Sequence, residues 1–188
     1  MKLRSDFLTS FRPAERTQFQ FSQQSQSHRT LYASLDQHSA KMKHEIEKFT
    51  IKGEIYIWKY LENENNYPGW NISFDRNVSE KLLELLNLMD NCEWSSKKTL
   101  QTNFPSQTQL GIANNRSGNA KWKSKSSLVL NLKKDEPTLW KIIEDEKQIE
   151  IRFGQKKLIE FRKAVVRKTN NLNDFAIYLD DENCLYFW

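Results

Sequence analysis

The residue types that most often perform catalysis are sparse in the part of this sequence that we expect to fold. All three histidines, His28, His38 and His44, precede residue 48, where the predicted domain begins. A Ser/His/Asp or Cys/His arrangement within that domain is therefore excluded, and so is the commonest kind of zinc site. The sequence contains no P-loop, GxGxxG or HExxH motif. We expect no cofactor and no bound metal.

Carboxylates alone could still support acid–base hydrolysis, and the sequence contains two candidate groups of them. Asp75 and Glu80 lie at the start of a predicted helix, and a run of acids follows at Asp180, Asp181 and Glu182. The structural alternatives are simple, because an aspartate at a helix start caps the helix and an acidic run often forms a solvated turn. A carboxylate-dependent hydrolase is the third and least supported hypothesis, and we expect that the protein is not an enzyme.

A cluster of basic residues surrounds a tryptophan in the segment NNRSGNAKWKSK, residues 114–125. Its candidate contact residues for nucleic acid or another partner are Arg116, Lys121, Trp122, Lys123 and Lys125. Cations along a phosphate backbone, with an aromatic ring for stacking, are typical of single-strand binding. Strand alternation places the three lysines opposite Trp122, which favours a lysine-protected edge strand with an inward tryptophan. Both interpretations stay open.

A second basic group lies on a helix predicted over about residues 155–168. Its members are Lys156, Lys157, Arg162, Lys163, Arg167 and Lys168. Such a group forms either a solvated face or a surface for nucleic acid or an acidic protein. The apolar residues Leu158, Phe161 and Val165 predict the buried face of the helix, with Ile159 and Val166 beside it.

The other predicted helix follows a short strand in which Trp70, Ile72 and Phe74 alternate with polar residues. Asn77 is the predicted N-cap, with Glu80 placed to reach back to it. The helix then covers about residues 78–90. Four apolar residues recur at helical spacing and are predicted core: Leu82, Leu85, Leu86 and Met89.

These elements predict an α+β fold with a mainly antiparallel, aromatic-rich sheet covered by two helices, about 78–90 and 155–168. We expect a flexible polar tail over 1–28, an amphipathic helix over 29–47 and a single α+β domain over 48–188. Residues 175–179 and 185–188 predict a final hairpin across the acidic run. Segments 72–86 and 151–161 share the order strand, break, helix. Duplication of a ββα unit would explain this, as would any α+β protein with two hairpins and two helices.

Composition limits the function further. The 188 residues carry a formal charge of +5, and residues 1–45 alone carry seven cations against four acids, so the basic balance of the rest is mild. No apolar run suits a signal peptide or a membrane span, and two cysteines suit a reduced, cytoplasmic protein. We predict a small non-catalytic binding or regulatory module acting through protein–protein contact, with single-stranded nucleic-acid binding as the alternative. The partner and the oligomeric state stay open.

Overall fold

The computed structural model describes residues 37–62, 67–111, 120–170 and 175–188. The chain divides into two units, Met1–His38 and Ser39–Trp188. The predicted tail over 1–28 and the first part of the predicted helix over 29–47 lie outside the described residues, so both stay predictions. In the second unit, residues 39–48 are helical, and Met42 and Ile46 on this helix are buried.

Helix α2, Arg76–Asn91, begins one residue after Asp75, which is its N-cap. The Asp75 carboxylate accepts a hydrogen bond of 2.7 Å from the backbone N–H of Val78. The prediction that Asn77 caps this helix is therefore wrong, because Asn77 already lies inside its first turn. The predicted core residues of this helix are confirmed as fully buried: Leu82, Leu85, Leu86 and Met89.

Helix α4, Gln155–Thr169, follows strand β7 without a loop. Gly154 is the N-cap, and a Cβ atom at this position would collide with the Glu136 carbonyl. Glycine therefore allows the close passage of the chain at the start of the helix. Leu158, Phe161 and Val165 are fully buried, as predicted.

The described strands form two sheets. The first has the order β4-β1-β2-β9-β8. Its strands are β1 Ile55–Tyr60, β2 Trp70–Phe74, β4 Trp122–Ser124, β8 Phe175–Ile177 and β9 Leu185–Phe187. The predicted final hairpin is confirmed, since β8 and β9 pair antiparallel. Strand β9 also pairs in parallel with β2, which lies far away in the sequence.

The second sheet has the order β3-β5-β7-β6. Its strands are β3 Ser96–Gln101, β5 Ser127–Lys133, β6 Trp140–Glu144 and β7 Gln148–Gly154. The pairings β3–β5 and β6–β7 are antiparallel, whereas β5 and β7 pair in parallel. Each long helix thus follows an antiparallel hairpin, β1–β2 or β6–β7. A duplication as the origin of this arrangement stays a prediction.

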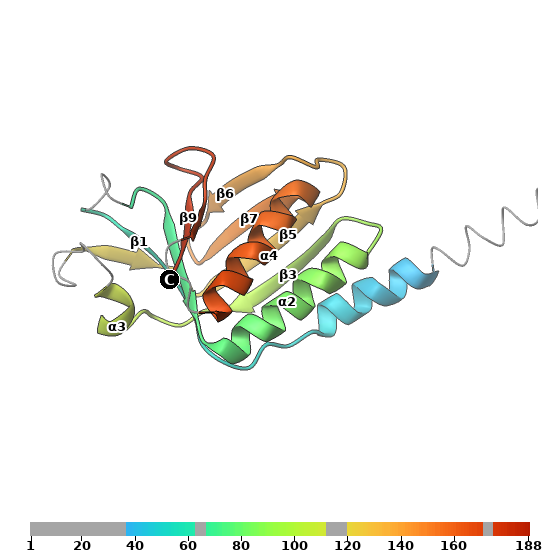
Figure 1. Cartoon of the computed structure of the whole chain (residues 1–188), viewed down its shortest axis with the longest axis horizontal. Coiled ribbons are helices and arrows are strands. Elements are labelled where there is room, and N and C mark those ends of the chain that lie inside the picture. The colour runs from blue at the N-terminus through green and yellow to red at the C-terminus, as the bar shows by residue number, and fades with distance from the viewer. Residues whose placement is uncertain (1–36, 63–66, 112–119, 171–174) are drawn as a thin grey trace, which may run out of the picture. The chain divides into compact units, whose positions relative to one another are not determined.

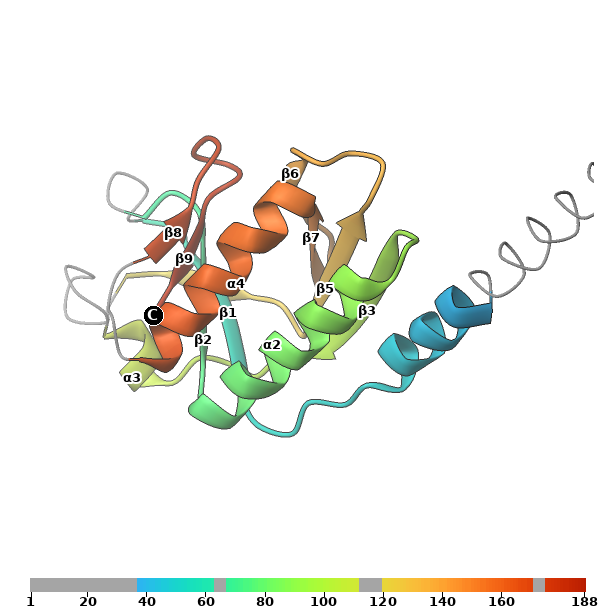
Figure 2. The ribbon, with the colours of Figure 1, turned by 45° about the vertical axis from the view of Figure 1, so that its right-hand side comes forward.

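Both sheets contribute to one apolar core beneath α2 and α4. The two helices lie side by side across strands β3, β5 and β7 (Figure 1), and the β8–β9 hairpin stands beside α4 (Figure 2). Phe161 of α4 shows how the core is joined, because its ring meets Trp140 and Phe153 of the four-stranded sheet and Phe187 of β9. The opposite face of β1 carries a second cluster, with Trp58 and Tyr60 packed against Leu110 of the short helix α3, Gln107–Leu110.

The predicted α+β class is confirmed, and most of the described strand pairs are antiparallel, as expected. The structure differs in having two mixed sheets where a single one was expected. Alternation in a sequence shows which residues share a face of a strand, but it does not show which strand lies next to it.

Candidate functional site

The basic cluster around Trp122 is the first candidate site from the sequence, and those of its cations that the structure describes are paired with acids. Arg116 lies outside the described residues. The ammonium groups of Lys123 and Lys125 each lie 2.8 Å from a carboxylate oxygen of Glu144, at the end of β6. Lys121 lies 2.9 Å from Glu62. Three of the candidate cations therefore already have protein partners.

Glu144 is held in its charged form by these two lysines. Burial acts to raise the pKa of Glu144, but the hydrogen bonds from Lys123 and Lys125 outweigh this effect and lower the pKa below its ordinary value. The Lys125 side chain is only 10% exposed and also donates to the Asp145 carbonyl at 2.6 Å. This cluster connects the edge strand β4 to the end of β6.

Trp122 lies on the opposite face of β4 from Lys123. The half-buried Trp122 packs on the cluster around Trp58 and Tyr60, whereas the ammonium of Lys123 lies 5.8 Å from the ring centre of Trp70. Among the described residues, Trp122 and Lys123 therefore face opposite sides of β4, and a role of this cluster in binding nucleic acid stays a prediction. These contacts are typical of a lysine-protected edge strand.

Two of the carboxylate candidates, Asp75 and Asp180, accept hydrogen bonds from nearby backbone N–H groups. Asp75 caps α2, as described above. Asp180 accepts hydrogen bonds from the side-chain amide and the backbone N–H of Asn183 and from the backbone N–H of Glu182, and these bonds lower its pKa. Within the described ranges, no group of three His, Cys, Asp or Glu side chains could hold a metal ion.

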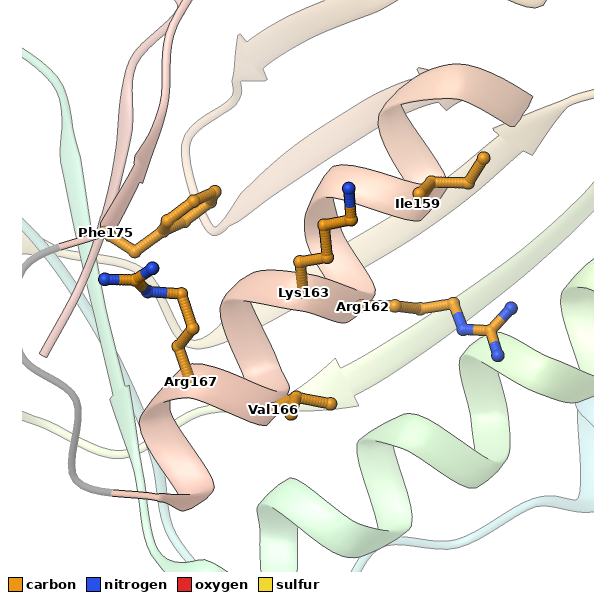
Figure 3. Close-up of a pocket in the computed structure, with 6 residues that line it drawn as sticks. All are labelled: Ile159, Arg162, Lys163, Val166, Arg167 and Phe175. Carbon is orange, nitrogen blue, oxygen red and sulfur yellow. The ribbon is translucent and has the colours of Figure 1, made fainter.

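A groove over the outer surface of α4 is the site that the structure adds. It encloses about 540 Å³ and is lined by Ile159, Arg162, Lys163, Val166, Arg167 and Phe175 (Figure 3). We call this set the α4 groove. All but Phe175 come from α4, and Phe175 comes from the neighbouring edge strand β8.

Two apolar residues of α4 are exposed in this groove. Ile159 is 48% exposed and Val166 is 44% exposed. Seven residues are about two turns of helix, so these side chains point to the same side, about 10 Å apart along the helix axis. The sequence places both beside the buried face, because the apolar character of a residue does not show how much of the helix surface the rest of the protein covers. The sequence signal for their exposure was their position on the helix, outside the stripe formed by Leu158, Phe161 and Val165.

The cations of the α4 groove differ in their partners. Arg162 points towards α2 and lies 3.0 Å from the Asp90 carboxylate. Lys163 and Arg167 are exposed, and within the part of the chain that the structure describes neither has a carboxylate partner. The Arg167 guanidinium lies 5.6 Å from the ring centre of Phe175. This contact extends the arginine across the ring, where its charge borders the apolar part of the groove.

The charge of the chain is concentrated on α4. Its 15 residues include six cations and one acid, Glu160. The helix therefore has the same formal charge, +5, as the whole chain of 188 residues. The cations near its end, Arg167 and Lys168, also suit the negative end of the helix dipole. Burial lowers the pKa of Lys168, which does not line the groove.

In the described part of the chain, no helix combines the length and the apolar character needed to cross a membrane. The fold and the α4 groove define an α+β protein with a basic and apolar helix surface. No known family model matches the chain, and no curated protein is significantly similar to it.

Proposed function

We propose that this protein is a small, non-catalytic binding or regulatory module that acts through protein–protein contact at the α4 groove. The observation that carries the proposal is the pair of exposed apolar residues, Ile159 and Val166, on one helix face beside Phe175. Apolar side chains grouped on a surface and bordered by charges are typical of a contact site, because a partner removes them from water.

The lining of the groove supports binding over catalysis. The described residues that line it offer no carboxylate, imidazole, thiol or hydroxyl group that could act as nucleophile or general base. The cationic side chains of Lys163 and Arg167 attract acidic groups. We also propose a cytoplasmic location, which the free, buried Cys92 and Cys184 support.

Single-stranded nucleic-acid binding at Trp122 is the second candidate. It is favoured by Lys121, whose side chain is 77% exposed beside a half-buried tryptophan. The sharing of Glu144 by Lys123 and Lys125 weakens it, because a phosphate would have to displace this carboxylate. Salt-sensitive oligonucleotide binding that is lost in a K121E/K123E/K125E variant would support this second function.

Site-specific photo-cross-linking in cells of the native source tests the protein-binding proposal. A photoreactive amino acid replaces Lys163 in one full-length variant and Glu80, an exposed residue on α2, in a control variant. We expect discrete protein adducts from position 163 that disappear when Val166→Asp is added, and none from position 80. Adducts of equal yield at both positions, or adducts that Val166→Asp leaves unchanged, would contradict a role for the α4 groove.

A further inference from the structure

We propose that the element bound in the α4 groove is an acidic amphipathic α-helix of a partner protein. This inference rests on the proposed function and specifies the chemistry of the partner. It follows from the spacing of the exposed apolar residues, the placement of the unpaired cations and the charges of the other possible occupants.

The apolar spacing matches a helix. Ile159 and Val166 lie about 10 Å apart along α4, so two apolar residues seven positions apart on a second helix can meet both of them. Phe175 closes the groove on the side of β8 and offers a third apolar contact. A helix that presents one narrow apolar stripe fits this arrangement.

The unpaired cations lie on one flank of that stripe. Lys163 and Arg167 are four residues apart, one turn of helix, and Figure 3 shows both on the side of Phe175, whereas Arg162 points towards α2. Arg162 already pairs with Asp90, and Lys157 pairs with Glu160. A complementary helix therefore needs carboxylates about one turn apart along a single flank, where they can reach Lys163 and Arg167.

Charge argues against two other occupants. A second copy that packed α4 against α4 would bring two helices of net charge +5 together. Residues 1–36 contain several phenylalanines but carry five cations against three acids, so this segment of the chain is repelled as well. An acidic partner is attracted to the same surface from a distance.

A designed peptide tests the inference on the full-length protein. The peptide has about 18 residues, five turns of helix, with leucines on one face and glutamates along one flank. Two matched peptides carry glutamine or lysine in place of glutamate. We expect the glutamate peptide to bind, to shift the amide NMR signals of residues 159–167 and 175, and to bind roughly tenfold more tightly than the glutamine peptide.

Charge reversal supplies the matched controls. The K163E/R167E variant should bind the glutamate peptide roughly tenfold more weakly and should gain binding of the lysine peptide. Lys141→Glu changes an exposed cation of β6 that lies outside α4 and does not line the groove, and we expect it to leave the affinity for the peptide within about twofold. Equal melting temperatures show that all variants are folded.

Three results would overturn the inference: no binding of the glutamate peptide, equal binding of all three peptides, or signal shifts away from α4. A further assay measures binding of the protein to vesicles of phosphatidylcholine and phosphatidylserine. Binding to them that K163E/R167E abolishes, without peptide binding, would assign the surface to an anionic membrane. Specific cross-links at position 163 together with a failed peptide assay would leave protein binding supported and reject the acidic helix as the partner element.

Discussion

At the scale of single residues, Asp75 is the side chain with the clearest local effect. Its carboxylate accepts the Val78 N–H and so satisfies one of the backbone donors that the first turn of α2 leaves unpaired. We expect Asp75→Ala to lower the free energy of unfolding by about 0.5–2 kcal/mol in a urea titration. Asn77→Ala, inside the helix and exposed, is the control and should stay within about 0.5 kcal/mol of the wild type.

The lowered pKa of Glu144 predicts how its contribution to stability changes with pH. The pKa of this carboxyl is lower in the folded protein than its ordinary value of 4.5, because Lys123 and Lys125 hold the charged form. A group with a lowered folded pKa stabilises the protein above its unfolded pKa, and this contribution is lost as the pH falls through the folded pKa. Wild type should therefore be more stable than Glu144→Gln at pH 7, by less than about 1 kcal/mol because the pair is partly exposed.

Unfolding titrations at several pH values measure this difference. It should remain constant down to about pH 6 and shrink as the pH falls below the ordinary carboxyl pKa of 4.5. A difference that is as large at pH 2.5 as at pH 7 would show that the two lysines do not act on the charge of Glu144.

At the scale of elements, α4 has two apolar sides with different roles. Phe161 is fully buried between the two sheets, and truncation to alanine should lower the free energy of unfolding by about 3–5 kcal/mol. Val166, on the outer side, is 44% exposed, so Val166→Asp should change stability by no more than about 0.5 kcal/mol. Denaturant titrations of the two variants measure the contrast. A loss above 2 kcal/mol for Val166→Asp would place this residue in the core.

Most elements of the described part could be predicted from the sequence, because periodicity is a local property. Leu82, Leu85, Leu86 and Met89 repeat at helical spacing and are buried, and Trp70, Ile72 and Phe74 alternate and form β2. The cap was harder to place, since Asp75 and Asn77 are both residue types that cap helices and only the geometry of the turn separates them.

The candidate site could be predicted only in part, because its properties depend on contacts between distant segments. The cations of α4 were recognised, but the pairing of Arg162 with Asp90 joins two helices, and Phe175 reaches the groove only because β8 lies beside α4. In the same way, the sharing of Glu144 by Lys123 and Lys125 joins the two sheets and could not be predicted from the local alternation of charges.

At the scale of the whole molecule, the polar composition of residues 1–28 predicts that the protein folds without them. Ordering such a segment costs more conformational entropy than its few apolar side chains can offset. A chain that begins at residue 29 should keep the melting temperature of the full chain within about 2 °C in a thermal melt followed by circular dichroism. A drop of about 8 °C or more would show that Phe7, Phe11 or another residue of this segment packs on the rest of the protein.

The position of β9 also affects the order in which the protein can be completed during synthesis. All strands of the sheet β3-β5-β7-β6 have been made once residue 154 has been added. The other sheet needs residues 185–187, because β9 lies between β2 and β8. Until then, one side of β2 has no neighbouring strand, and an unpaired edge of this kind invites pairing with other chains. A nascent chain on the ribosome therefore has the strands of one sheet complete while the other still needs an interior strand.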